Sequence, residues 1–201
     1  MSYITTDNIT SINAELSNYC NAACPMCARF FIDGKLNKEK VNSIHTTLSF
    51  LQDKIGDQII KKLKQFTSCG NYGDGAMNPE CVEIYKWIKG INPTCRLSLH
   101  SNGGARNEIF WHDLAKLGVH VIFAIDGLED TNHLYRRNVI WKRIIDNASA
   151  FIDAGGLARW RMLVFDHNKH QIEECQQLAH DMGFVAFDVN GGYTFTAMDS
   201  I

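Results

Sequence analysis

The sequence predicts an α/β fold in which parallel strands form a partial (β/α)6 barrel of the TIM type. Strand-like and helix-like segments alternate along the whole chain of 201 residues, and repeated βαβ units of this kind pair their strands in parallel through right-handed crossovers. The chain carries six strand segments, fewer than the eight of a closed TIM barrel, so we expect an open barrel. Because no linker, repeat or low-complexity tract divides the chain, we expect a single domain over residues 1–201.

The predicted strands are short segments rich in apolar residues. The clearest is 119–125, a continuous apolar run that is typical of a parallel strand buried on both faces. In folds of this class, ligands bind at the carboxyl ends of the strands, so the loops that follow the strands are the places to search for chemistry. The six strands are expected at 12–16, 65–69, 96–100, 119–125, 159–165 and 184–189.

Five helical segments separate these strands, and each has apolar residues at helical spacing. The segment 49–64 is predicted to be one helix. The start of the next helix is predicted at Asn78-Pro79, with asparagine as the N-cap and proline at the first helical position. Glycines 118, 155 and 183 are expected to end the later helices. The remaining helices are expected at 107–117, around 140–154 and at 171–182.

Composition excludes several classes of protein. The chain is 45% hydrophobic and 21% charged, with a net charge of −2 and no basic run, which argues against binding of bulk nucleic acid. No apolar stretch approaches the roughly 20 residues that span a membrane. The N-terminal segment lacks the features of a signal peptide, so a cytoplasmic location is expected.

Three of the seven cysteines form a C-x3-C-x2-C array directly after the first predicted strand: Cys20, Cys24 and Cys27. Thiolates bind soft metals and iron–sulfur clusters, and such short spacings allow one loop to wrap one metal centre. Structural zinc more often takes four ligands from paired C-x2-C elements. Three thiolates on a cluster of four irons would leave one iron open to an external chelator. The other cysteines are scattered and are interpreted as small buried apolar residues.

This cysteine loop resembles the signature of radical S-adenosylmethionine (radical SAM) enzymes. The resemblance implies a 4Fe-4S cluster held by Cys20, Cys24 and Cys27, which are then the catalytic and metal-binding residues. It also implies that SAM chelates the open iron and that its reductive cleavage gives a 5′-deoxyadenosyl radical, which abstracts hydrogen from the substrate. Met26 stands before the third cysteine, where the family often has an aromatic residue near the adenine.

Other strand-end loops extend the resemblance and imply further SAM-binding residues. Gly73 and Asp74 match the end of a Gly-Gly-Glu-like segment that binds the SAM amino group. The segment 101–103 is similar to the family's Thr-Asn-Gly, which implicates Ser101 and Asn102. Read without the resemblance, both segments are ordinary turns.

The fourth and fifth strands end in similar matches. The segment 123–127 resembles a Ser-x-Asp pattern that contacts the ribose and methionine of SAM, with Ala124 in place of the serine and Asp126 retained. The resemblance implies that an arginine pairs with the methionine carboxylate, and we expect Arg136 rather than Arg137. Asn168 is expected close to the site, with the N-cap of the following helix as its alternative role.

The resemblance extends from about residue 12 to residue 189 and implies a minimal core with one cluster and no auxiliary-cluster region. It implies a reducing electron donor of the flavodoxin or ferredoxin type, and a small-molecule, nucleotide or peptide substrate. The substrate surface would come from the open side of the barrel, the residues after Phe187, a partner protein that supplies the substrate, or another subunit.

Two other functions remain open at this stage. The first is an iron–sulfur protein that transfers electrons or senses redox state without cleaving SAM. The second is a zinc-stabilised binding module, which would need a fourth ligand such as Cys69. A histidine-based zinc hydrolase is disfavoured, because the eight histidines are dispersed and none forms an H-E-x-x-H pair.

Overall fold

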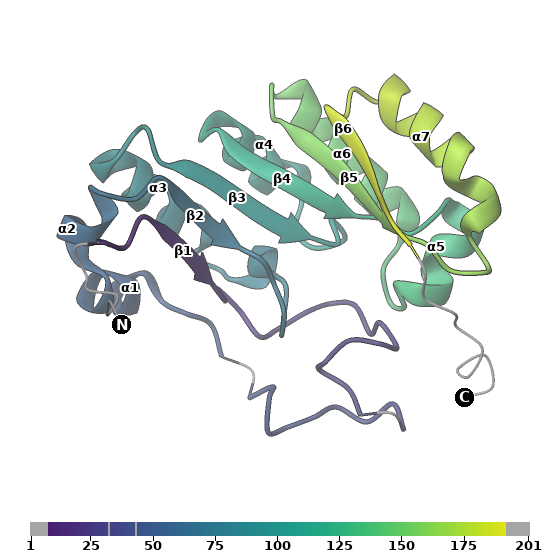
Figure 1. Cartoon of the computed structure of the whole chain (residues 1–201), viewed down its shortest axis with the longest axis horizontal. Coiled ribbons are helices and arrows are strands. Elements are labelled where there is room, and N and C mark those ends of the chain that lie inside the picture. The colour runs from purple at the N-terminus through teal and green to yellow at the C-terminus, as the bar shows by residue number, and fades with distance from the viewer. Residues whose placement is uncertain (1–7, 32, 43, 192–201) are drawn as a thin grey trace.

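The computed structural model describes residues 8–31, 33–42 and 44–191. The N-terminal segment considered for a signal peptide, and most of the residues after Phe187, lie outside these ranges. Six parallel strands form one sheet in the order in which they occur in the chain, as predicted (Figure 1). The first and last strands form the two edges of an open sheet. The strands are β1 (Ser11–Ala14), β2 (Gln65–Ser68), β3 (Arg96–Ser101), β4 (Val119–Ala124), β5 (Ala158–Leu163) and β6 (Ala186–Asn190).

Helices connect successive strands and cover one side of this sheet, and Figure 1 shows α3, α4 and α6 behind it. None of the helices in the described part of the chain is long and apolar enough to cross a bilayer. The helices are α1 (Leu48–Lys54), α2 (Gly56–Ile60), α3 (Cys81–Ile91), α4 (Glu108–Lys116), α5 (Glu129–Tyr135), α6 (Trp141–Asp153) and α7 (Ile172–Asp181), with short 3-10 turns η2 (Gly75–Met77) and η3 (Lys169–Gln171).

Side chains on the helix-facing side of the sheet form the core. Phe66, Leu99 and Trp160 alternate with polar residues along β2, β3 and β5. These three side chains and Phe123 of β4 are completely buried. The aromatic rings of this set pack against further aromatic residues, and the ring centroids of Phe123 and Trp111 lie 5.2 Å apart. Burial of this apolar layer holds the sheet against its helices. Because all six strands are parallel, their carboxyl ends meet along one edge of the sheet.

Two helix predictions are wrong in detail. The predicted helix 49–64 is broken into α1 and α2 at Gly56, whose positive φ of 69° does not belong to a right-handed helix. The helix expected to begin at Asn78-Pro79 begins at Cys81 instead. The side-chain oxygen of Asn78 still accepts from the amide of residue 80 at 2.8 Å, as expected of a capping asparagine. Its side-chain amide donates to the carbonyls of Leu16 and Thr46 at 2.6 and 2.8 Å.

One helix, α5, has no counterpart in the sequence prediction. It spans only seven residues, too few for apolar periodicity to be recognised. Asn132 on this helix is completely buried and accepts a 2.8 Å hydrogen bond from the backbone amide of Asp126. The helix ends at Tyr135 and Arg136 is its C-cap, so the position of the helix decides where that arginine is placed.

Candidate functional site

A cavity of about 350 Å³ lies where the loops after β1, β2 and β3 meet the end of β4. It brings together most of the predicted site residues, although they are far apart in the sequence. A larger cavity of about 710 Å³ beside Arg106 and Arg143 contains none of the cysteines, so size alone does not identify the site. The predicted residues that line the smaller cavity are Cys20, Cys24, Met26, Cys27, Gly73, Asp74, Ser101, Asn102 and Arg136.

The cysteine loop is held in place by hydrogen bonds to its backbone. The amide of Cys27 donates to the carbonyl of Cys24 at 3.0 Å, which forms a tight turn. Ala23 donates its amide to the carbonyl of Arg137 at 2.9 Å, and the guanidinium of Arg29 donates to the carbonyl of residue 22 at 3.1 Å. The loop is therefore fixed from both sides before any ligand binds.

The donor set of this cavity fits an iron–sulfur cluster. All three cysteines of the loop are free thiols, and burial raises the pKa of Cys20 to about 12 and the pKa of Cys24 above its usual value. Among the residues that the structure describes, no three His, Cys, Asp or Glu side chains converge on one point as a single metal ion requires. A cuboidal cluster binds each thiolate through a different iron, so it suits ligands that are spread around one cavity.

Cys69, the fourth ligand that a zinc site would need, also lines the cavity. Its thiol lies 3.0 Å from the side-chain oxygen of Asn13, to which it donates, and it accepts from the side-chain amide of Asn71 at 3.4 Å. These contacts turn Cys69 toward β1 and its neighbouring loop. Sequence reasoning treated this residue as a buried apolar cysteine, whereas it is only partly buried.

Gly73 allows the loop after β2 to contact the backbone that leads into the cysteine loop. A Cβ atom at this position would lie 2.1 Å from the carbonyl oxygen of Ser17 and 2.6 Å from the Cα atom of Asn18. The next residue, Asp74, donates its amide to the carbonyl of Tyr19 at 2.7 Å. The predicted glycine is thus needed for close packing of two loops, and this packing places the cysteine that follows Tyr19.

The carboxylate of Asp74 organises the loop after β3. One oxygen, Oδ2, accepts from the hydroxyl of Ser101 at 2.9 Å and from the backbone and side-chain amides of Asn102 at 2.9 and 2.8 Å. The other oxygen, Oδ1, accepts from the amide of Ala76 at 3.0 Å. Burial raises the pKa of Asp74 above its usual value, and these hydrogen bonds act in the opposite direction.

The side chain of Asn102 connects the hydrogen bonds of Asp74 to the cysteine loop. Its side-chain amide lies 3.5 Å from the sulfur of Cys20 and donates to the side-chain oxygen of Asn21 at 2.9 Å. Its own oxygen accepts from the amide of Gly104 at 2.8 Å. A hydrogen-bond donor therefore lies next to a predicted metal ligand.

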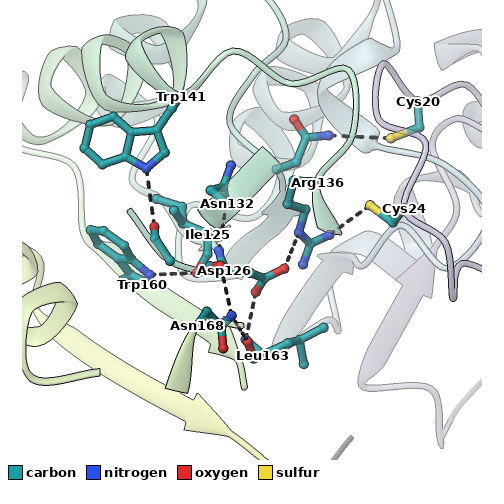
Figure 2. Close-up of polar contacts among 12 residues, drawn as sticks. Cys20, Cys24, Ile125, Asp126, Asn132, Arg136, Trp141, Trp160, Leu163 and Asn168 are labelled. Atoms are coloured by element: carbon teal, nitrogen blue, oxygen red, sulfur yellow. Dashed lines mark hydrogen bonds and ion pairs between the residues drawn. The ribbon is translucent and has the colours of Figure 1, made fainter. Parts of the chain in front are cut away.

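Asp126 and Arg136 form a buried ion pair beside the second cysteine (Figure 2). The guanidinium donates through Nε to the Oδ2 atom of Asp126 at 2.6 Å, and its Nη1 atom lies 3.7 Å from the sulfur of Cys24. The second carboxylate oxygen accepts from the amide of Leu163 at 2.7 Å. Burial raises the pKa of Asp126, whereas the nearby guanidinium lowers it. Asp126 thus holds Arg136 from behind the cavity, and Arg137 does not line it.

Asn168 is not brought to the cavity. Its side-chain amide donates to the carbonyls of Asp126 and Leu163 at 3.0 and 2.9 Å (Figure 2). Its side-chain oxygen accepts from the amide of Phe165 at 2.7 Å. It is completely buried and does not cap the following helix with its side chain. Asn168 therefore ties the ends of β4 and β5 together and supports Asp126.

His100 and Tyr135 are among the residues that line the cavity but were not predicted from the sequence. His100 lies on β3 one position before Ser101, and strand alternation places the two side chains on opposite faces of the sheet. Burial and the charge of Arg161 lower the pKa of His100 below the usual value for histidine. Because His100 lies near the carboxyl end of a predicted strand, the sequence could have identified it as a candidate. The position of Tyr135 is set by helix α5, which was not predicted.

Comparison with known proteins gives matches only by structure: no family model and no curated protein matches this sequence. SuiB from Streptococcus suis, in a crystal structure bound to precursor peptide SuiA, is similar with a TM-score of 0.71, 14% identity, and coverage of 90% of this chain and 39% of SuiB. A histidine-tagged form of anSMEcpe with bound AdoMet has a TM-score of 0.70 and 13% identity, with coverage of 92% of this chain and 50% of that chain.

SuiB bound to S-adenosylmethionine is similar to the same degree, with a TM-score of 0.70, 14% identity, and coverage of 93% of this chain and 41% of that one. This chain thus spans between 39% and 50% of the length of these three structures. The similarity extends over nearly all of the sheet and its helices, and it bears out the fold that the resemblance implied. The chain has the fold of SuiB and anSMEcpe.

Proposed function

We propose that this chain is a radical SAM enzyme that holds a 4Fe-4S cluster through Cys20, Cys24 and Cys27 and binds SAM in the adjoining cavity. The observation that carries the proposal is the composition of this cavity. Three thiols from one short loop share it with the carboxylate of Asp74 and the guanidinium of Arg136. An electron carrier or a structural zinc site has no need of such a charged pair of groups beside its ligands.

When bound, the cluster supplies one electron to SAM, whose cleavage into methionine and a 5′-deoxyadenosyl radical allows a hydrogen atom to be taken from the substrate. That electron has to come from a reduced donor, for which we propose a flavodoxin- or ferredoxin-like protein. The residues of this chain bind and orient both ligands. Asn102 and Arg136 present N–H groups to the sulfurs of Cys20 and Cys24, and hydrogen bonds to sulfur are one of the means by which proteins adjust a cluster's potential.

Two groups are suited to the methionine part of SAM. Asp74 Oδ1 accepts one hydrogen bond, from Ala76, and a carboxylate oxygen has room for a second donor such as an ammonium group. Arg136 is anchored to Asp126 through Nε, which leaves its fork directed along the cavity toward Cys24. A guanidinium held in this way can pair with a carboxylate through its remaining N–H groups.

For the substrate, we favour a peptide over the small molecules and nucleotides that the sequence also allows. The support is that SuiB was crystallised with precursor peptide SuiA, and anSMEcpe with AdoMet and the Cp18Cys peptide. The open side of the sheet offers the room that such a substrate needs, since β1 and β6 are at separate edges.

Electron paramagnetic resonance of the anaerobically reconstituted and reduced chain tests this proposal. We expect a 4Fe-4S signal whose shape changes when SAM is added, because SAM reaches the open iron. A cluster signal that is indifferent to SAM would instead support the electron-transfer function. Absence of any cluster, with zinc bound instead, would support the binding module.

A further inference from the structure

The face of the sheet opposite the helices is polar where a closed barrel would be apolar. In a TIM barrel this face is the packed interior, filled mainly by branched apolar side chains. Here the strand register places His100 beside Ile122, Ala124 beside Arg161, and Arg161 beside Asp188. His100, Arg161 and Asp188 are only partly buried. This face is therefore suited to contact water or a ligand rather than to pack.

The charges on this face are not balanced. Arg159 donates to both carboxylate oxygens of Asp188, from Nε to Oδ2 at 3.2 Å and from Nη2 to Oδ1 at 2.8 Å. Arg161 lies farther from the same carboxylate, with Nη2 3.8 Å from Oδ2. Two guanidinium groups thus share one carboxylate, and a positive charge remains in excess. The other charged or titratable residues on this face of β3 and β4 are Arg96, His100 and His120.

Arg161 also has an unused hydrogen-bond donor. Its Nε atom is buried and has no acceptor among the residues that the structure describes. Buried donors in folded proteins nearly always have a partner, either a protein group or a bound molecule. The geometry of β5 therefore leaves a place for an acceptor beside Arg161.

This place adjoins the candidate site. His100 and Ala124 both line the cavity that contains the three cysteines, and Arg161 lies opposite Ala124 on the neighbouring strand. The methyl side chain of Ala124 is too short to separate the cavity from Arg161 on this face. A ligand that reaches from the cavity across β4 would meet Arg161 first.

We propose that Arg161 and His100 form an anion subsite that binds a carboxylate or phosphate group of the substrate and positions the substrate beside the cavity. A planar guanidinium with a free Nε–H matches the two oxygens of either anion. This inference rests on the proposed function, which makes the cavity next to the subsite the place of reaction. Such a subsite would favour substrates that carry a carboxylate or phosphate group.

The test uses the reconstituted full chain and two probes at constant ionic strength. Inorganic phosphate is titrated and followed by phosphorus NMR, and acetate is titrated separately and followed by proton NMR. We expect the NMR line of phosphate, of acetate or of both to broaden in a saturable way when the wild-type chain is present. In Arg161→Gln we expect the affinity for that anion to fall about tenfold or more, as for loss of a charge-assisted hydrogen bond. Arg96→Gln is the matched control, because it removes a positive charge from the same face at the start of β3.

Saturation by phosphate or by acetate supports the subsite and indicates which anion the substrate carries. The absence of saturation with both probes, or an equal loss of affinity in the two variants, would overturn it. SAM binding is measured in the same preparations and is expected to be unchanged in Arg161→Gln. A wild-type chain that fails to bind SAM would contradict the proposed function, whereas the anion titration decides the subsite independently.

Discussion

The guanidinium of Arg136 bridges the carboxylate of Asp126, 2.6 Å from its Nε atom, and the sulfur of Cys24, 3.7 Å from its Nη1 atom. Asp126 is completely buried, and 15% of the Arg136 side chain is exposed. The pair therefore connects the end of β4 to the cysteine loop through the end of α5. Both charges are removed from water, so their geometry has to be maintained for the pair to be tolerated.

Arg136→Lys tests this bridge. A lysine keeps the charge but presents a single ammonium group, which cannot reach both partners as the fork does. Loss of one hydrogen bond to a charged group costs about 2 kcal/mol. For a chain of this size, that lowers the thermal midpoint by about 4–8 °C. Calorimetry of the reconstituted variant measures the change.

Arg137→Lys is the matched control for that experiment. Arg137 contributes its backbone carbonyl to the cysteine loop, and a lysine retains this carbonyl. Arg137 is only partly buried and the substitution keeps its positive charge, so we expect a change in the free energy of unfolding within about 0.5 kcal/mol. Equal shifts for the two variants would show that the bridge by Arg136 has no special role.

Cys24→Ala is expected to abolish cluster incorporation, because the two thiolates that remain cannot hold a cuboidal cluster. Iron and acid-labile sulfide are measured after anaerobic reconstitution. Cys175→Ala is the control, since Cys175 is buried in α7 away from the cavity. If Cys24→Ala retained full iron and sulfide, the assignment of this ligand would be wrong.

Asp74→Ala is expected to retain the cluster, because all three thiols remain, and to weaken SAM binding about tenfold or more. The magnitude corresponds to the loss of a charge-assisted hydrogen bond to the SAM ammonium group. Equilibrium binding of SAM to the reconstituted variant measures it, with Asp53→Ala, an exposed position on α1, as the control. An unchanged dissociation constant would limit Asp74 to its structural bonds with Ser101 and Asn102.

Gly73→Ala is expected to displace the backbone at Ser17, because the added Cβ atom would lie 2.1 Å from its carbonyl oxygen. Overpacking of this kind costs about 1–3 kcal/mol, and we expect reduced iron content because the displaced segment leads to Cys20. Gly90→Ala in α3 meets no atom within 4 Å and is expected to stabilise the helix by about 0.5–1 kcal/mol. Thermal midpoints and iron content of the two variants are compared, and similar results for both would argue against the close contact at Gly73.

Local sequence patterns determined much of this protein. The alternation of strands and helices predicted the open parallel sheet, since βαβ units pair their strands in parallel and six strands are fewer than a closed barrel needs. The C-x3-C-x2-C spacing identified the loop that lines the candidate site. Asp74, Ser101 and Asn102, which also line it, were expected there because their segments resemble motifs of the radical SAM family. These signals are readable because strand ends of a parallel sheet lie at one edge.

Contacts between distant segments were decided only by the tertiary structure. Asn168 was expected close to the site, but its side-chain amide donates to the carbonyls of Asp126 and Leu163 instead. Apolar spacing predicted one continuous helix over 49–64, whereas the structure has two helices that meet at Gly56. The subsite at Arg161 depends on which strand lies beside β5 and in what register. Register and loop direction follow from packing of the whole sheet against its helices, and no stretch of neighbouring residues contains that information.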